Sequence, residues 1–469
     1  MPPLVGAALV LSLTWPFLVP GEAFALRDMM VLPGMALTRA SLGAGDLAAR
    51  NVPQDALLGL LPFPVAALRV MVAAAAAGAA WAGWRSSATA WGRCAAMTVA
   101  VWNPFVVERL LQGQWSLAVA AWLLPLIAVS GSWVARWLAS LTPTGAIASV
   151  LMSRTRAQLI VTSALCLPWV AAGFAAGSGT SSPASATAFA PRAERWVGTL
   201  GAVAGLGGIW NGAAVPASRS AGFAVFGIAL LLVLALGWRS VERRLLVLAA
   251  AGFAVAVLSW AGALGWAVAA LPGGGLLRDA QKWLILALPA FVSAAGALRP
   301  TRAALALVLA LLQVPDAPLA VAALTPVTVE ELHVPPVDDR GRDVFFVDRP
   351  ALSRRADGQP VVDPVPKMMN VVEPGELVVD GVVVDPVSPR WREARDHPDE
   401  IAALRGLGIG VVVHPDGTAT DTGAPPRGLP TAGLLFFALW LAVPLAGLAQ
   451  AALTCGRVRR GARRALTSP

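Results

Sequence analysis

The stretch Leu26-Arg27-Asp28-Met29-Met30 places one carboxylate directly after an apolar run that covers residues 4 to 24. A carboxylate held at such a boundary can act as a general base that removes the proton of an attacking hydroxyl group. We therefore take Asp28 as the candidate catalytic residue and Arg27 as a neighbour that binds substrate. The alternative is a solvated loop in which Arg27 and Asp28 form an ion pair of little energetic value.

Two cations flank a second carboxylate in the stretch Arg278-Asp279-Ala280-Gln281-Lys282, which follows three consecutive glycines. The glycines lack the preceding strand and the spacing of a nucleotide-binding loop. Arg278 and Lys282 suit an anionic ligand such as a lipid phosphate, held by charge-assisted hydrogen bonds. A solvated helix start with local ion pairs is the alternative for this stretch.

Two further polar clusters lie at the ends of apolar segments and could bind substrate. The first is rich in hydrogen-bonding groups for so short a connection and contains Asn103, Glu108, Arg109, Gln112 and Gln114. The second contains Trp210, Asn211 and Arg219 beside glycines. Tryptophan can stack on a sugar ring and asparagine can hydrogen-bond it, whereas the simpler interpretation is an ordinary helix exit and an interfacial turn, since tryptophan is common at membrane interfaces.

The composition shows what kind of fold must position these groups. Of the 469 residues, 57% are hydrophobic and only 13% are charged, against about 25% charged in soluble proteins. The net charge of +9 does not indicate nucleic-acid binding, because no basic run is interleaved with stacking aromatic residues. The sequence therefore predicts a multi-pass membrane protein with no nucleic-acid partner.

Apolar windows long enough to cross a bilayer predict about ten transmembrane helices. They cover residues 4–24, 65–84, 94–108, 115–134, 157–176, 221–238, 245–266, 282–298, 303–323 and 431–454. We expect the first helix to be retained rather than removed as a signal peptide, because it lacks the charged start of such signals. Residues 137–152, interrupted by Thr142-Pro143-Thr144-Gly145, are expected to form a re-entrant or surface hairpin.

Arginines fall on alternate connections between these windows, and arginine in short loops is retained on the cytoplasmic side. These connections contain Arg85 and Arg93, then Arg136, Arg154 and Arg156, then Arg239, Arg243 and Arg244, then Arg299 and Arg302, and finally the basic C-terminal tail. The pattern predicts a plasma-membrane protein with both termini in the cytoplasm.

One predicted exterior connection is large enough to fold separately. We divide the chain into a transmembrane domain (1–325), an extracytoplasmic α/β module (326–430), and a last helix with its basic tail (431–469). In the module we expect strands at 344–347, 377–379 and 409–413 and a helix from Pro398 to Gly406. Residues 177–188 are expected to form a flexible loop, and neither the three cysteines nor the three histidines have metal-ligand spacing.

Taken together, Arg27-Asp28-Met29 and the stretches 102–115, 207–219 and 278–283 resemble an uncharacterised family of actinobacterial polytopic membrane proteins that look like GT-C-type glycosyltransferases. The resemblance implies a GT-C-like bundle, a polyprenyl-phosphate sugar donor and a cell-envelope glycan or glycolipid acceptor. It also implies that Asp28 takes the place of the catalytic carboxylate, and that Arg278 with Lys282 takes the place of the phosphate-binding cations. The chain departs from the class in having one acid beside Arg27 where many members have a paired acidic motif.

We therefore expect an envelope glycosyltransferase whose sites comprise Asp28 as the base and a set of binding residues. That set is Arg27, Asn103, Glu108, Arg109, Gln114, Trp210, Asn211, Arg219, Arg278, Asp279 and Lys282. No cofactor is indicated, and a divalent metal ion is left open. The alternative is an envelope glycolipid transporter or flippase, or a non-catalytic assembly partner in the membrane, although the spans lack the central ionisable residues of coupled transporters.

Overall fold

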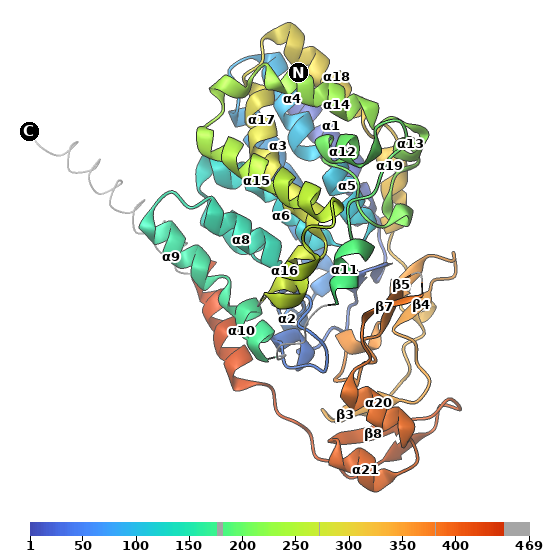
Figure 1. Ribbon diagram of the computed structural model, residues 1–469. Coiled ribbons are helices and arrows are strands. Elements are labelled where there is room, and N and C mark those ends of the chain that lie inside the picture. Colours follow the sequence, from blue (N-terminus) through green and yellow to red (C-terminus); the bar gives the residue numbers. More distant parts are fainter. Residues whose placement is uncertain (176–181, 272, 380, 445–469) are drawn as a thin grey trace, which may run out of the picture.

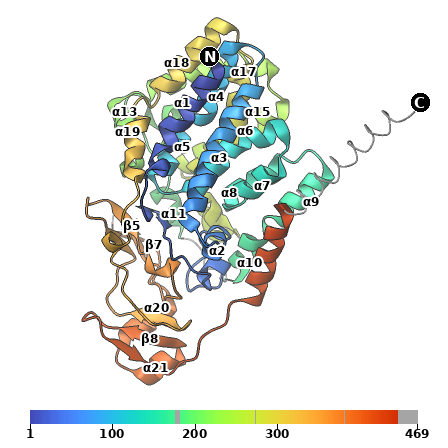
Figure 2. The ribbon, with the colours of Figure 1, turned by 180° about the vertical axis from the view of Figure 1, so that it is seen from behind.

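The protein consists of a large helical part and a small mixed module at one end of it (Figure 1). The computed structural model describes residues 1–175, 182–271, 273–379 and 381–444. Residue 1 lies at the end of the helical part opposite to the module in both views (Figures 1 and 2). Most described residues outside the module are helical, as expected.

The helical part begins with α1 (Pro2–Thr14) and a short hairpin of β1 (Phe24–Leu26) and β2 (Met29–Val31). The helices that follow are α2 (Gln54–Leu60), α3 (Pro64–Arg85), α4 (Ala90–Val101), α5 (Pro104–Leu111), α6 (Trp115–Ser130), α7 (Trp133–Ala139), α8 (Pro143–Leu151), α9 (Arg156–Ala164), α10 (Leu167–Ala175), α11 (Pro183–Ala188), α12 (Gly198–Ala204), α13 (Ala217–Ala221), α14 (Val225–Ala235), α15 (Arg243–Trp260), α16 (Gly265–Ala270), α17 (Leu288–Gly296), α18 (Pro300–Leu312) and α19 (Ala317–Ala320).

The expectation of about ten full spans is wrong for the described residues. Four helical stretches are long and apolar enough to cross a membrane: Pro64–Arg85, Ala90–Leu111, Arg243–Trp260 and Pro300–Leu324. A fifth is formed if α9 and α10, which are bent by 41° relative to each other, count as one span. Five other apolar helices are shorter: Pro2–Leu18, Trp115–Ser130, Val225–Ala235, Ala280–Gly296 and Thr431–Pro444.

Backbone breaks inside apolar windows explain the difference. The window 221–238 contains an 11-residue helix, α14, which at about 1.5 Å per residue is too short for a hydrocarbon core of about 30 Å. The window 282–298 begins as a 3-10 helix (Ala280–Ala287) before α17 starts. The mean hydropathy of a window does not change where a helix ends or becomes a 3-10 helix. Counting apolar windows therefore overestimates the number of full spans.

Two other expectations concern short segments. Residues 137–152 form parts of α7 and α8, which have 7 and 9 residues and are each too short to span. Of the expected loop 177–188, residues 177–181 lie outside the described residues and Pro183–Ala188 form helix α11 rather than a loop. The expected last helix is described as far as Pro444, and Trp440 Nε1 donates a hydrogen bond of 2.7 Å to Ser140 Oγ.

Helix α4 is the centre of the bundle, and α3, α17 and α18 pack around it. Small residues permit this packing. A Cβ atom on Gly83 of α3 would lie 2.5 Å from the backbone nitrogen of Met97 on α4, which is closer than any real contact. Close approach of helix backbones through small residues is a common way for helices to associate in membranes.

The module contains a three-stranded sheet, two hairpins and two helices, as expected for an α/β unit. Strand β3 (Asp343–Phe346) pairs in parallel with β8 (Ile409–Val413), which pairs antiparallel with β9 (Ala419–Asp421). The hairpins are β4 (Leu352–Arg354) with β5 (Pro360–Val362) and β6 (Leu377–Val379) with β7 (Val382–Asp385), and the helices are α20 (Pro389–Asp396) and α21 (Ile401–Gly406). The three expected strands are confirmed to within one residue, whereas the helix expected from Pro398 begins at Ile401.

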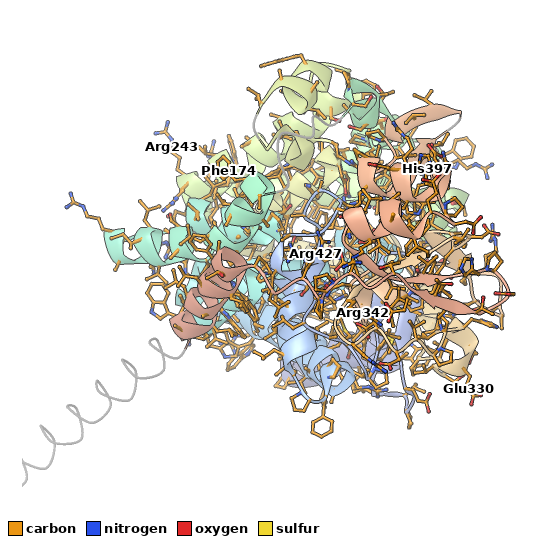
Figure 3. The ribbon with its side chains drawn as sticks, turned by 90° about the horizontal axis from the view of Figure 1, so that it is seen from below. Phe174, Arg243, Glu330, Arg342, His397 and Arg427 are labelled. Atoms are coloured by element: carbon orange, nitrogen blue, oxygen red, sulfur yellow. The ribbon has the colours of Figure 1, made fainter. Side chains whose placement is uncertain are left out.

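Ion pairs connect the module to the segment between α1 and α3. Arg390 contacts Asp46 at 3.1 Å, Lys367 contacts Asp55 at 2.5 Å, and Arg50 contacts Asp385 at 3.0 Å. Within the module Arg342 pairs with Asp421 at 2.7 Å. Figure 3 looks onto this end and shows Arg342, Arg427 and the exposed His397 on the module. The module therefore holds the segment that contains Asp28.

Candidate functional site

The Asp28 carboxylate lies in the two-residue turn between β1 and β2, where Leu26 pairs with Met29. Arg27, the first residue of this turn, has φ of +49°, a left-handed conformation that is uncommon for residues other than glycine. Its buried guanidinium donates hydrogen bonds of 2.6 Å to the carbonyl oxygens of Leu111 and Ala213. Arg27 therefore anchors the turn, and Asp28 beside it is exposed.

The backbone of the turn is held from two sides. The Arg27 N–H donates to the Pro360 carbonyl (2.7 Å), and the Val362 N–H donates to the Arg27 carbonyl (3.0 Å), so β5 of the module runs alongside the turn. The Asp28 N–H donates to the carbonyl of Gln112, at the end of α5 (3.1 Å). Backbone contacts with both parts of the protein thus fix the position of Asp28.

The two oxygens of the Asp28 carboxyl group have different surroundings. Oδ2 accepts hydrogen bonds from Gln112 Nε2 (3.1 Å) and Gln114 Nε2 (3.2 Å). Oδ1 has no hydrogen-bond partner among the described residues. Desolvation by the surrounding protein raises the pKa of this carboxyl group, and the two amide hydrogen bonds lower it by less. The arrangement orients the carboxylate through one oxygen and leaves the other available.

Arg109 connects Asp28 to the stretch around Asp279. Its fully buried guanidinium donates to Gln114 Oε1 (2.6 Å), to both oxygens of Asp279 (2.5 and 2.9 Å) and to Gln281. A bidentate arginine–carboxylate pair fixes the orientation of both groups. The donors on Gln114 that reach Asp28 are therefore positioned from Asp279 through Arg109.

The glycine-rich stretch around Trp210 is connected to Asp28 through Gln112. Asn211 Nδ2 donates to Gln112 Oε1 (2.7 Å), which connects Asn211 to Asp28 through one amide. The Trp210 ring packs edge-to-face on Phe189, with ring centroids 4.6 Å apart. The Arg278 guanidinium lies over the same Phe189 ring, 4.5 Å from its centroid. Aromatic surface and hydrogen-bonding groups are thus grouped near the carboxylate.

The two candidate phosphate-binding cations differ in their surroundings. Arg278 forms a bidentate pair with Asp385 on β7, at 2.7 and 3.0 Å, so an anionic ligand must compete with that carboxylate. Lys282 is half-buried and has no hydrogen bond or ion pair within the described part of the chain. Lys282 is consequently the freer of the two cations.

Three expected substrate-binding residues are instead buried structural groups. Asn103 caps α5 by accepting from the Val106 N–H at 3.0 Å and is 2% exposed. Glu108 is fully buried and accepts from the N–H groups of Gly208 (3.4 Å) and Ile209 (3.0 Å). Arg219 is fully buried and pairs with Glu194 at 2.5 Å. Glu108 therefore faces the backbone of residues 207–209.

The sequence did not single out Asp385 and Phe189 of the site, and it did not indicate the role of Gln112. Asp385 lies in the stretch Val382-Val383-Val384-Asp385, which contains no local sign of a partner 107 positions earlier. Phe189 follows α11 and comes directly after the expected loop 177–188. Gln112 was noticeable as one of several polar groups in a short connection, but only its contacts with Asp28 and Asn211 show its role.

Gly113 provides a test of how the turn is positioned. It has φ of +85°, and a Cβ atom there would lie 2.8 Å from Asp28 N and collide with Leu26 O and Met29 N. We expect Gly113→Ala to displace the Asp28 turn and remove the function that depends on it. Gly131→Ala is the matched control, because Gly131 also has positive φ (+65°) but its Cβ would meet only Gln158 Nε2, at 3.1 Å. Equal activity of the two variants, measured at equal abundance, would contradict this role of Gly113.

The described residues near Asp28 do not fit a divalent metal ion. No group of three or more His, Cys, Asp or Glu residues in the searched part of the chain could hold one. Asp279, the acid whose charge affects Asp28, has both oxygens bound by Arg109. We accordingly assign no step to a metal ion.

The site thus combines an exposed, oriented carboxylate with a lysine that has no ion pair among the described residues, a paired arginine and aromatic surface. No protein-family model matches the chain, and the searches found neither a curated protein nor a solved structure with significant similarity to it.

Proposed function

We propose that the protein is a GT-C-like membrane glycosyltransferase that moves a sugar from a polyprenyl-phosphate donor onto a cell-envelope glycan or glycolipid. The observation that supports this most directly is the Asp28 carboxylate, which is exposed, oriented through Oδ2 and unpaired at Oδ1 among the described residues. Such a group suits a general base, and the pKa raised by desolvation makes it a stronger base than an ordinary aspartate.

The proposed reaction is a substitution at the anomeric carbon of the donor sugar. Asp28 Oδ1 accepts the proton of an acceptor hydroxyl group while the hydroxyl oxygen bonds to the anomeric carbon. The bond between that carbon and the phosphate oxygen breaks, and polyprenyl phosphate leaves with the electron pair. Lys282 would stabilise the departing phosphate by charge, and Arg278 would do so after exchanging Asp385 for the phosphate.

The aromatic groups support a sugar ligand. Trp210 is half-buried and lies in one packed group with Phe189 and Arg278. Asn211 is connected to Asp28 through Gln112. A sugar ring on the Trp210 face would lie next to hydrogen-bonding amides, which is the combination that carbohydrate binding requires.

The direct test is an assay of the purified full-length protein with radiolabelled polyprenyl-phosphate sugars and envelope glycan extracts. Transfer of label to glycan, lost on Asp28→Asn, is the expected result. Movement of intact glycolipid across a vesicle membrane without any transfer would instead identify a flippase, the other function considered for this chain.

We also propose a multi-pass location in the plasma membrane with both termini in the cytoplasm and the module outside. In a variant without the native cysteines, Ala356→Cys on the module should react with an impermeant thiol reagent in intact cells. Ser240→Cys, also exposed, should react only after the cells are opened. Labelling of Ser240→Cys in intact cells would reverse the orientation.

A further inference from the structure

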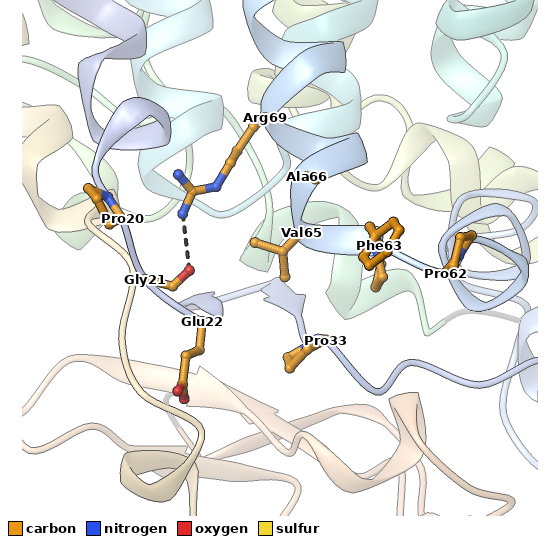
Figure 4. A pocket seen from close by; sticks show the side chains of 10 residues that line it. Pro20, Gly21, Glu22, Pro33, Pro62, Phe63, Val65, Ala66 and Arg69 are labelled. Atoms are coloured by element: carbon orange, nitrogen blue, oxygen red, sulfur yellow. Dashed lines mark hydrogen bonds between the residues drawn. The ribbon is translucent and has the colours of Figure 1, made fainter.

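A recess whose lining does not include Asp28 lies between residues 20–22, which follow α1, and the start of α3 (Figure 4). It has a volume of about 390 Å³ and is lined by residues 20–22, Pro33, residues 62–66 and Arg69. Arg69 and Glu22 are its charged residues, and most of the remaining lining is proline, phenylalanine, valine and alanine. The recess is therefore apolar with one positive and one negative group.

Arg69 projects from α3 toward the recess and is fixed there. It donates hydrogen bonds of 3.1 Å to the carbonyl oxygens of Phe17 and Gly21, and its guanidinium lies 5.2 Å from the centre of the Phe24 ring. These contacts hold a cation at the module end of a helix, where the positive-inside rule disfavours arginine. A cation held at this position can attract an anionic group of a ligand.

Glu22 provides the opposite charge. Its Oε2 atom accepts from the Val329 N–H at 2.9 Å, while Oε1 has no hydrogen-bond partner in the described part of the protein. Glu22 is exposed, and Figure 4 shows it on the module side of Gly21, whereas Arg69 lies on the side of the helices. The cation is therefore deeper toward the bundle and the carboxylate is nearer the exterior.

An exposed apolar stripe runs from the recess along the whole of α3. Its members are spaced by three or four residues, as on one face of a helix: Ala66, Val70, Ala74, Ala77, Trp81 and Trp84. Phe63, 74% exposed, lies at the recess end of this stripe. The stripe offers an apolar surface long enough to contact an acyl chain.

From this arrangement we propose that the recess binds the headgroup of a zwitterionic aminophospholipid, phosphatidylethanolamine. The lipid phosphate contacts Arg69, the primary ammonium donates to Glu22 Oε1, and an acyl chain lies along the α3 stripe. The order of charges agrees, because in an outer-leaflet lipid the phosphate is deeper than the ammonium. A purely anionic lipid would meet Glu22 as a repulsive neighbour.

The test measures lipid binding to the purified full-length protein by native mass spectrometry. Phosphatidylethanolamine, phosphatidylcholine and phosphatidylglycerol are added separately to delipidated protein in detergent. We expect phosphatidylethanolamine to bind about tenfold more tightly than the other two, the effect of one charge-assisted hydrogen bond. Arg69→Ala should weaken its binding about tenfold. Arg85→Ala is the matched control, because Arg85 lies at the other end of α3 and also contacts an aromatic ring, that of Trp81 at 5.8 Å.

Glu22→Gln tests the proposal independently if Arg69→Ala fails to fold. Glutamine retains a side-chain oxygen that can accept from the Val329 N–H, and the position is exposed. It should reduce phosphatidylethanolamine binding to the level of phosphatidylcholine. Equal binding of all three lipids to the unaltered protein would overturn the proposal. Unchanged selectivity in Glu22→Gln, or preference for phosphatidylglycerol, would do so as well. None of these outcomes depends on glycosyltransferase activity.

Discussion

Asp28→Asn is expected to abolish complementation of a deletion strain while leaving the abundance of the protein unchanged. Asparagine retains a side-chain oxygen that can accept from Gln112 and Gln114, so the turn between β1 and β2 should keep its position. It cannot accept a proton, and the loss of general-base catalysis costs roughly 100- to 10,000-fold in rate. Envelope glycan extension in the complemented strain is the measurement.

The pH dependence distinguishes a base from a binding group. The base acts only when ionised, so activity should rise with pH through the pKa of Asp28. Because desolvation raises that pKa, the rise should lie at higher pH than for an ordinary aspartate. Asp348→Asn, the same change at an exposed carboxylate of the module, should leave activity unaltered. Full complementation by Asp28→Asn would remove the enzyme hypothesis in this form.

Arg109→Met is expected to give the largest loss of stability. It removes the only cation that binds the Asp279 carboxylate directly in the described structure and leaves that 8% exposed group unpaired. Removing one partner of a buried ion pair destabilises proteins by roughly 3 to 5 kcal/mol. The midpoint of thermal unfolding of the detergent-solubilised protein should fall, and so should its abundance in the membrane.

A compensating change separates stability from function. Arg109→Met combined with Asp279→Leu replaces both charges by apolar groups, and such replacements are often neutral or stabilising. The double variant should therefore regain most of the lost stability. It should remain inactive, because Gln114 is no longer held against Asp28 by Arg109. A single Arg109→Met variant with unchanged unfolding would show that the Arg109–Asp279 pair does not support the fold.

The sequence indicated which segments form the site but not which side chains face it. Charged and amide groups beside apolar segments directed attention to Asp28, Arg109 and the stretch 278–282, and the structure connects them. Asn103, Glu108 and Arg219 have the same character in sequence but are buried and form helix caps and internal pairs. Spacing cannot distinguish a polar side chain that satisfies buried backbone from one that faces a ligand.

Contacts between segments far apart in the chain could not be predicted from the sequence either, because local patterns do not show which segments meet. The pair of Arg278 with Asp385 and the contact of Val362 with the Asp28 turn join segments whose local sequence contains no mutual signal. Local patterns were sufficient for the module strands β3, β6 and β8, because short β-branched runs bounded by turn residues specify them. They did not reveal β4, β5, β7 and β9. They were insufficient for the number of spans, because apolar composition does not reveal where a helix bends or ends.

The backbone hydrogen bonds between Arg27 and β5 affect how the protein is made. Arg27 and Pro360 are joined by a hydrogen bond, although more than three hundred residues of chain separate them. At a ribosomal rate of about 5 to 20 residues per second, the second partner emerges roughly 17 to 67 s after the first. During that interval a nascent chain has its first helices but lacks the strand that completes the Asp28 turn. Chains that end before β5 should therefore be inactive, and the Asp28 turn should reach its final position only late in synthesis.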